Sequence, residues 1–416
     1  MYMSRFGVKN YKCLADVDIP LTPIHVLIGE NDAGKTSVLE AISALYASPH
    51  EKLKYLFPEP WDGRELVLHG VKDPRLSLAA EWRAAGTETE ENAELRYQFA
   101  VSFPFAGTDC TRLQDEEKLI YNGRLSDLLA SMVSSDKSHT VLFERLADQL
   151  FVSPANRLPE YNLVRSILKA TSIYRFDPHA MKRPATIDPA QPFRLDADGS
   201  RLAPLLHDIL GHDATDFIKL QDQFCRLFPQ FRRVRVQTEN IPEPHPRERA
   251  VYAQSVAGPP EVVLKPAVGA SVYLETHTGE TIRAQQASDG AILLLGFLAI
   301  AHLPEPPTLL LIEEPENGVY PKRLGQVIEL LKQMVQGDGG VRFPQIIMTT
   351  HSPYVLSFFE PEEVTFLSRD PEKPEAGVRA RPLRDAANIR EWLGGGGFYL
   401  GELWYNMSEK ELFGDP

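Results

Sequence analysis

The segment GENDAGKT at residues 29–36 constrains the fold of this chain more than any other feature. It directly follows the apolar run Ile24–Ile28 and directly precedes apolar residues at helical spacing, from Val38 to Leu45. Strand, G-x-x-x-x-G-K-S/T loop and helix in this order form the phosphate-binding loop of nucleoside triphosphatases. The alternative is a plain glycine turn before a helix. The pattern predicts an α/β fold in which a sheet strand delivers a phosphate-binding loop.

The chemistry of this loop follows from its residue types. Backbone N–H groups at a helix N-terminus suit phosphate oxygens, and Gly29 and Gly34 allow the backbone to approach them closely. Lys35 reaches the β and γ phosphates, and the Thr36 hydroxyl ligates Mg²⁺. The predicted nucleotide-contacting residues of the loop are Gly29, Glu30, Asn31, Asp32, Ala33, Gly34, Lys35, Thr36 and Ser37.

A second segment, LLLIEEPE at residues 309–316, places adjacent carboxylates at the end of an apolar strand. Carboxylates at the carboxyl edge of a parallel sheet face the bound phosphates. Glu313 is therefore a predicted metal ligand, together with Thr36, and Glu314 a predicted general base that orients and deprotonates the attacking water. The alternative is a strand that ends in a solvated acidic turn.

Two further segments complete the candidate site. QIIMTTHSP at residues 345–353 is a buried strand that ends in His351, a candidate γ-phosphate contact or a structural histidine. In AQQASDGAILLL, residues 284–295, Ser288 or Asp289 caps an apolar helix and Gly290 lies in its first turn. A capped N-terminus attracts anions, although a capped core helix explains the segment equally well. The predicted catalytic residues are thus Lys35, Glu314 and His351.

The composition and net charge of the chain limit which partners and which cellular compartment are possible. The chain has 416 residues and a formal net charge of −13, which argues against a surface coated with nucleic-acid-binding groups but leaves room for a local basic groove. Two basic clusters are candidates for such a groove, and solvated faces are the alternative. They are Arg165, Lys169, Arg175, Lys182 and Arg183, and Arg226, Arg232, Arg233 and Arg235. Three widely spaced cysteines, no secretory signal and no apolar run of membrane-spanning length predict a cytoplasmic protein without membrane association.

The order of elements predicts three parts, residues 1–105, 106–240 and 241–416. The first combines the phosphate-loop half with antiparallel strands at 66–68, 76–82 and 95–103. The second is an inserted helical lobe, with helical spacing at 111–171 and 202–228 and no heptads for long coiled-coil arms. The third holds a proline-rich loop at 241–266, a hairpin that turns at Thr278 and Gly279, a strand at 308–312, a helix at 321–336 and a strand at 345–349.

Taken together, these motifs resemble the ABC-type P-loop ATPases, in the clade of RecF, SMC-like and OLD-family proteins (AAA_21 or AAA_15 type). GENDAGKT resembles Walker A, ASDG at 287–290 a degenerate signature motif, LLLIEEPENG Walker B with its D-loop, and TTHSP the H-loop. IYRFDPHAMKRPA at 173–185 resembles the RecF-type Q-loop segment without its glutamine, which makes Asp177 and His179 candidates. DGSRLAPLL at 198–206 resembles the helix start that follows.

The resemblance implies ATP and Mg²⁺ as cofactors and a homodimer or higher homo-oligomer. In this family each ATP lies between the Walker motifs of one subunit and the signature helix of another. It also implies that residues 10–12 lie near adenine. Three departures predict slow hydrolysis: the incomplete signature, Glu313 in the place of aspartate, and Tyr320 in the place of the D-loop histidine. About 65 residues follow the H-loop, so a TOPRIM nuclease is not expected in this chain.

Three functions compete at this stage. The first is an ATPase whose dimerisation switches action on DNA, RNA or a separate effector, a nuclease or toxin, in DNA repair or anti-phage defence. The second is an ATP-bound scaffold that holds such an effector with little turnover, docked on helices within residues 111–171. The third, the ATP-binding subunit of a membrane transporter, fits poorly because the signature is incomplete and the middle region is long.

Overall fold

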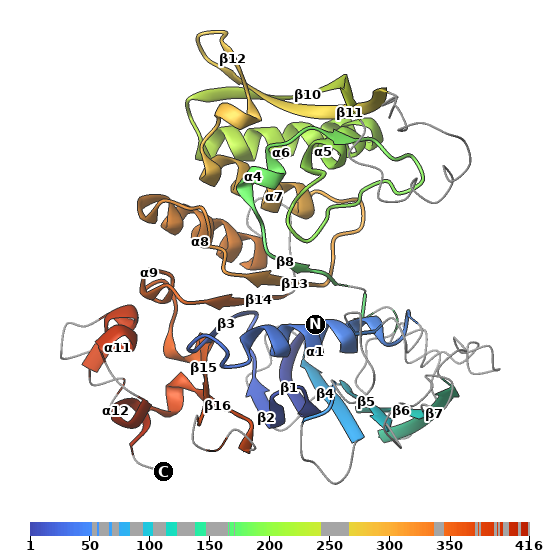
Figure 1. The fold of residues 1–416 in the computed structure, drawn as a ribbon, viewed down its shortest axis with the longest axis vertical. Helices are drawn as coiled ribbons and strands as arrows, with labels where there is room; N and C mark the ends of the chain where they lie inside the picture. The colour runs from blue at the N-terminus through green and yellow to red at the C-terminus, as the bar shows by residue number, and fades with distance from the viewer. Residues whose placement is uncertain are drawn as a thin grey trace, which may run out of the picture. The chain divides into compact units, whose positions relative to one another are not determined.

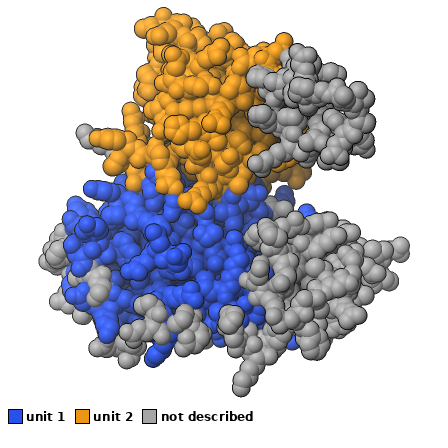
Figure 2. Space-filling model, in the orientation of Figure 1, with its two compact units in different colours: residues 1–173, 307–316, 328–416 blue, residues 174–306, 317–327 orange. Residues whose placement is uncertain are grey.

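The protein is described here by a computed structural model with two compact units (Figure 2). Unit 1 comprises residues 1–173, 307–316 and 328–416, and unit 2 comprises residues 174–306 and 317–327. The structure describes residues 1–51, 56–57, 66–68, 75–83, 95–102, 114–122, 138–146, 165, 167–169, 171–242, 266–336, 345–370, 373, 376–386, 389, 392–393, 399–406 and 409–414.

A six-stranded, largely parallel sheet organises unit 1, in the order β16-β15-β3-β14-β13-β8. Its strands are β3 (Ile24–Ile28), β13 (Leu309–Glu313), β14 (Gln345–Thr350), β15 (Val364–Arg369), β16 (Val378–Pro382) and β8 (Ile173–Tyr174), where the chain passes to unit 2. β3, β13 and β14 are fully buried and run parallel, with β14 in the middle (Figure 1). Continuous apolar runs are what strands covered on both faces require, and their carboxyl ends meet at one edge.

An antiparallel sheet forms the second layer of unit 1, in the order β2-β1-β4-β5-β6-β7. Its strands are β1 (Tyr2–Tyr11), β2 (Leu14–Pro20), β4 (Arg75–Arg83), β5 (Leu95–Ser102), β6 (Gln114–Asn122) and β7 (Ser138–Leu146). The buried alternate residues of β1 and β4, among them Phe6, Val8 and Trp82, share one apolar core with the helix α1 (Lys35–Ala47) and with Leu27. The alternation of buried and exposed residues thus turns one face of this sheet toward the core.

The buried amide of Gln345, at the start of β14, ties the two sheets of unit 1 together. Its Oε1 accepts from the Met3 N–H at 3.0 Å, and its Nε2 donates to the carbonyls of Met3 at 2.7 Å and Thr22 at 3.0 Å. The side chain therefore satisfies three buried backbone groups at once, as a polar residue in this position must.

Unit 2 packs helices on a four-stranded antiparallel sheet. β11 (Pro266–Thr276) pairs with β10 (Phe231–Pro242), β12 (Thr281–Arg283) and β9 (Ala185–Thr186). Its helices are α4 (Pro178–Met181), α5 (Leu202–His212), α6 (Ala214–Leu227) and α7 (Asp289–Ala301), with the 3₁₀ turn η4 (Ala284–Gln286). The remaining elements in the described part of the chain are α8 (Pro321–Gln336), α9 (Pro353–Leu356), η5 (Pro361–Glu363), η7 (Leu383–Asp385), α11 (Leu400–Asn406) and α12 (Glu409–Phe413).

Most predicted elements are confirmed, and the helical prediction for residues 111–171 is wrong at two places. β6 and β7 are strands, because Ile120, Tyr121, Val141 and Phe143 are β-branched or aromatic residues that pair across the sheet more readily than they form helices. The helically spaced leucines near residue 128 lie outside the described residues, as do 243–265 of the expected loop. The hairpin forms as predicted, with Gly279 at φ 85°. The three-part division stays a prediction.

One continuous helical stretch was expected at 202–228, and two helices form. Asp213 has extended backbone angles and accepts the Thr215 N–H at 2.7 Å, so it caps α6 directly after α5 ends. Among the residues that the structure describes, no helix has the length and apolarity needed to cross a membrane.

Candidate nucleotide-binding site

The loop between β3 and α1 can be built only with glycine at two positions. Gly29 has φ 155°, and a Cβ there would lie 2.3 Å from the carbonyl oxygen of Leu367. Gly34 has φ 87°, and its Cβ would meet Val378 Cγ2 at 2.9 Å. The first and last glycines of the motif are therefore required by sterics as well as by the close approach of phosphate.

Lys35 is a buried cation, 7% exposed, at the start of α1. Its Nζ donates to the carbonyl oxygens of Gly29 at 2.9 Å and Glu30 at 2.7 Å. Burial lowers the pKa of Lys35 to about 8, against the opposing effect of four nearby carboxylates, those of Glu314, Asp32, Glu313 and Glu316. A desolvated ammonium held by loop carbonyls suits an incoming anion.

Two adjacent glutamates end β13 in different environments. Glu313 is the last residue of β13 and is 9% exposed, and its Oε1 is buried without a hydrogen-bond partner among the described residues. Glu314 adopts a left-handed backbone conformation, φ 48°, with its N–H donated to the Thr349 carbonyl at 3.0 Å. Left-handed glutamate is uncommon and costs free energy, as is often seen at functional sites.

The carboxyl ends of three parallel strands bring these groups together. β3 leads into the loop, β13 into Glu313 and Glu314, and β14 into His351, whose Nε2 lies 3.4 Å from Glu314 Oε1. A residue not predicted from the sequence joins them: Glu316 accepts the Thr350 hydroxyl at 2.6 Å and the His351 N–H at 3.1 Å. The sequence feature that points to Glu316 is the presence of a third glutamate in the same segment, two residues after Glu314.

These residues fit a nucleotide with a magnesium ion. The buried, unpartnered Glu313 oxygen and the exposed Thr36 hydroxyl are oxygen donors of the kind Mg²⁺ takes alongside phosphate oxygens. The described part of the chain holds no cluster of three or more His, Cys, Asp or Glu side chains suited to a metal. That is expected for Mg²⁺, which uses one or two protein ligands plus substrate.

The signature-like segment belongs to unit 2, whereas the Walker-type residues belong to unit 1. Ser288 is the N-cap residue of α7, but its side chain makes no capping hydrogen bond, so the predicted side-chain cap is wrong. Asp289 lies in the first turn, where it suits the helix dipole and pairs with Lys182 at 2.5 Å. Gly290 is buried, and a Cβ there would be in ordinary contact with Arg323 Cβ at 3.9 Å.

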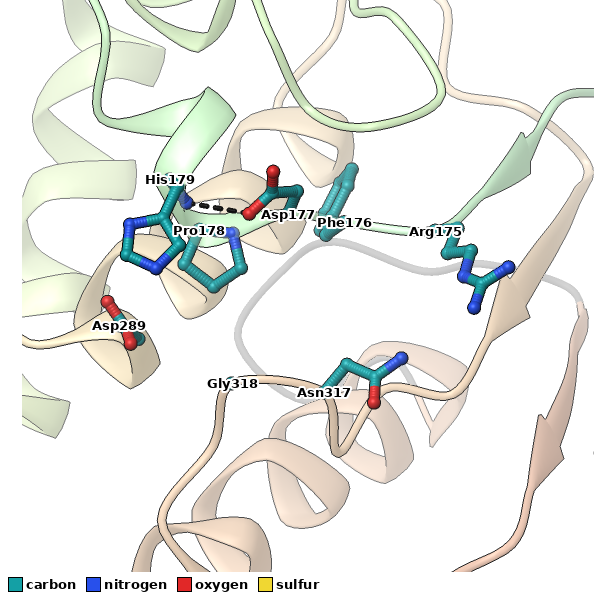
Figure 3. A pocket seen from close by; sticks show the side chains of 8 residues that line it. All are labelled: Arg175, Phe176, Asp177, Pro178, His179, Asp289, Asn317 and Gly318. Carbon is teal, nitrogen blue, oxygen red and sulfur yellow. Dashed lines mark hydrogen bonds between the residues drawn. The ribbon is translucent and has the colours of Figure 1, made fainter.

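A pocket of about 370 Å³ lies next to this segment within unit 2 (Figure 3). Asp177 accepts the His179 N–H at 2.9 Å and thereby caps α4. The Q-loop-like residues Asp177 and His179 thus share one cavity with Asp289 of the signature-like segment. Asn317 and Gly318, which directly follow the segment at residues 309–316, line the same cavity. The lining residues are Arg175, Phe176, Asp177, Pro178, His179, Asp289, Asn317 and Gly318.

The second basic cluster is partly neutralised. Arg232 pairs with the buried carboxylate of Glu275, and Arg235 Nε lies 3.4 Å from its other oxygen. These arginines lower the pKa of Glu275, which stays ionised. Two of the four positive charges are therefore used within unit 2.

Comparison with known proteins agrees with this geometry. The family model described as "AAA domain, putative AbiEii toxin, Type IV TA system" (AAA_21) matches residues 24–357, most of the chain. A curated OLD nuclease of Thermus scotoductus is 50% identical over 40 residues, which are 10% of this chain and 8% of that protein. The chain therefore aligns with only a small part of that relative's length.

The solved structures to which the chain is similar include heads of SMC proteins. One, an Smc head bound to the C-winged helix domain of ScpA, has 14% identity and a TM-score of 0.47, with coverage of 92% of this chain and 98% of that one. Another, the Smc head with an extended coiled coil bound to the C-terminal domain of ScpA from Pyrococcus furiosus, has 12% identity and a TM-score of 0.45, with coverage of 94% and 99%. At these values the likenesses carry no functional inference.

The family match spans the phosphate loop, the carboxylates of β13 and the histidine after β14, which the structure places at one edge of a parallel sheet. The chain belongs to the AAA_21 family of P-loop ATPases.

Proposed function

We propose that this protein binds ATP with Mg²⁺ and hydrolyses it to ADP and phosphate. The observation that carries the proposal is the convergence of Lys35, Glu313, Glu314 and His351 at the carboxyl ends of β3, β13 and β14. Parallel sheets place ligands at this edge, and phosphoryl transfer requires a cation, a metal ligand and a water-orienting base there.

Each side chain has a separate role in the proposed reaction. Lys35 and the loop N–H groups bind the β and γ phosphates, which replace the carbonyl oxygens of Gly29 and Glu30 as partners of Nζ. Thr36 and Glu313 would hold Mg²⁺, which would supply positive charge to neutralise the phosphates. Glu314 accepts a proton from the attacking water, and His351, 3.4 Å from Glu314, orients that carboxylate.

Steady-state phosphate release tests this proposal. Wild-type protein with ATP and Mg²⁺ is expected to release phosphate, and Glu314→Gln to lose this activity at least a hundredfold while it still binds ATP, because the amide cannot take the proton. Glu362→Gln, which changes an exposed carboxylate in the segment Pro361–Glu363, is the matched control. Equal rates in wild type and Glu314→Gln would exclude Glu314 as the base.

We further propose that ATP closes a homodimer in the cytoplasm. The exposed Ser288, whose side chain makes no capping hydrogen bond, supports a contact from α7 to ATP bound by a second subunit. ADP lacks the γ-phosphate that this contact needs, so hydrolysis reopens the dimer. Light scattering should show association of Glu314→Gln with ATP and none with ADP.

The closed dimer is proposed to switch a separate effector, a nuclease or toxin, or to act on DNA or RNA in repair or defence. A match to a protein named OLD nuclease and to a family whose description includes a toxin supports this direction. The remaining exposed arginines of the second basic cluster would contact phosphates. Unchanged ATPase rate and dimer lifetime on addition of duplex and single-stranded DNA would exclude DNA as the partner.

A scaffold that binds ATP with little turnover is the second candidate. Glu313 in the place of aspartate and the incomplete signature favour it. Unhydrolysed ATP that copurifies with wild-type protein and a bound effector would support the scaffold over the hydrolytic switch.

A further inference from the structure

Glu314 and His351 lie on two chain segments that leave the sheet at the same edge. The ladder between β13 and β14 ends at the pair Glu313 and Thr349, and one more backbone bond follows, from Glu314 N to Thr349 O at 3.0 Å. Beyond this point, within the described part of the chain, no ladder hydrogen bond holds the segment of His351 against that of Glu314. Whatever holds the two segments together there also sets the distance between the two side chains.

The carboxylate of Glu316 makes that connection. Its Oε1 accepts from the Thr350 hydroxyl at 2.6 Å and from the backbone N–H of His351 at 3.1 Å. Both donors belong to the residues that carry the histidine out of β14, and the carboxylate lies two residues after Glu314 in the chain. A single oxygen thus bridges the two segments.

The direction of these hydrogen bonds is fixed by their neighbours. Thr350 Oγ1 accepts the Ser352 N–H at 2.9 Å, so its single proton is free to point at Glu316. Thr350 is 1% exposed, and water does not compete for this hydroxyl. The chain from Ser352 through Thr350 to Glu316 is therefore polarised in one direction and defines the path of the backbone around His351.

The bridging oxygen and the second oxygen of Glu316 differ. Oε2 is buried and has no hydrogen-bond partner among the described residues. The bridge thus uses only Oε1, and an amide oxygen in the same place can accept the same two hydrogen bonds. This difference separates a role in positioning from a role of the negative charge.

We propose that Glu316 is a positioning residue for ATP hydrolysis: by bridging Thr350 and His351 to the β13 segment, it holds His351 in register with Glu314. The inference rests on the proposed function, because it concerns the efficiency of the same reaction. Glu316 itself touches neither nucleotide nor water in this account. A displacement of about 1 Å in a catalytic group can lower a rate on the order of a hundredfold.

Two pairs of variants test the proposal, each pair with a rescue. Glu316→Ala is expected to lower kcat about 10- to 100-fold with KM for ATP within about threefold, since the two hydrogen bonds of Glu316 go to Thr350 and His351 and not to the phosphate loop. Glu316→Gln keeps an acceptor oxygen and should recover most of kcat. Thr350→Val removes one donor at nearly constant volume and should lower kcat severalfold, and Thr350→Ser should restore it.

A second readout needs neither nucleotide nor activity. Hydrogen exchange of the His351 amide in the nucleotide-free protein should be faster in Glu316→Ala than in wild type and slow again in Glu316→Gln. Exchange in β3, measured in the same samples, controls for general unfolding.

The outcomes are distinct. If wild type hydrolyses ATP and Glu316→Ala keeps its kcat, or if Glu316→Gln is as impaired as Glu316→Ala, positioning by the bridge is refuted. An increase in KM as large as the loss of kcat would likewise refute it. Absence of wild-type turnover would refute the proposed function instead, and unchanged exchange at His351 in Glu316→Ala would then still refute the bridge.

Discussion

Replacement of Lys35 by methionine should stabilise the nucleotide-free protein while it removes ATP binding. Burial lowers the pKa of Lys35 from 10.5 to about 8, so the fold disfavours the charged ammonium. The shift corresponds to roughly 3 kcal/mol at neutral pH, at about 1.4 kcal/mol per pKa unit. The two hydrogen bonds to the carbonyls of Gly29 and Glu30 are lost in the variant and offset about 2 kcal/mol. We expect Lys35→Met to gain about 1 kcal/mol in free energy of unfolding.

The difference in free energy of unfolding between wild type and Lys35→Met should depend on pH. Because the folded-state pKa of Lys35 lies below its unfolded value, the unfolded chain binds more protons at neutral pH and up to the ordinary lysine pKa. Wild-type stability therefore rises with pH through the window between the two values. The wild type should gain about 2 kcal/mol relative to Lys35→Met between pH 7.5 and pH 9.5.

Denaturant unfolding without nucleotide or metal, at several pH values, measures this difference. The same experiment with a non-hydrolysable ATP analogue and Mg²⁺ should stabilise wild type only, since the ligand binds the folded state. Lys35→Met that is less stable than wild type by more than 1 kcal/mol at pH 7.5, or a difference that does not change with pH, would refute the reasoning about buried charge.

Three other predictions follow from the fold and the loop. His25 is fully buried between the hydroxyls of Thr22 and Thr365, and burial lowers its pKa to about 3. The folded protein therefore loses stability as the pH falls below about 6.5, the ordinary histidine pKa. Between pH 7.5 and pH 5, urea unfolding should show that wild type loses about 2 kcal/mol more than His25→Gln. Gln345→Leu should cost about 2–4 kcal/mol, because three backbone groups lose their partner, and a loss under 0.5 kcal/mol in the same assay would contradict this. Gly29→Ala should weaken ATP binding more than tenfold in calorimetry, since its Cβ would lie 2.3 Å from a carbonyl oxygen, and wild-type affinity would show that the loop adapts.

The hydrogen bonds around His25 determine its tautomer. Thr22 Oγ1 donates to the Ile24 carbonyl, so it can only accept from His25, and Nδ1 must carry the proton. Nε2 then accepts the Thr365 hydroxyl at 3.0 Å. Protonation of Nε2 would place a positive charge in a fully buried environment, which is why acid destabilises the site.

The parts of the fold that the sequence predicts are those with strong local signals. Continuous apolar runs in the sequence predict β3, β13 and β14. The helix α8 begins and ends at the predicted residues. The phosphate loop and the edge at which Glu314 and His351 meet follow from the rule that parallel strands end together.

The rest depends on contacts distant in sequence. β6 and β7 are strands because β6 pairs with both β5 and β7, and the spacing of leucines along the sequence does not reveal this pairing. The role of Glu316 arises because its carboxylate meets Thr350 and His351, more than thirty residues away. Ser288 is the N-cap residue of α7 without a side-chain capping hydrogen bond, and residue type alone does not determine whether that bond forms.

The bound-nucleotide content after a single turnover tests the central claim most directly. Protein mixed with less than one equivalent of ATP and Mg²⁺, then freed of unbound nucleotide and quenched with acid, is predicted to hold ADP in wild type and intact ATP in Glu314→Gln. Intact ATP in both wild type and Glu314→Gln would show that the protein binds ATP but does not hydrolyse it. ADP in both would contradict the assignment of Glu314 as the base.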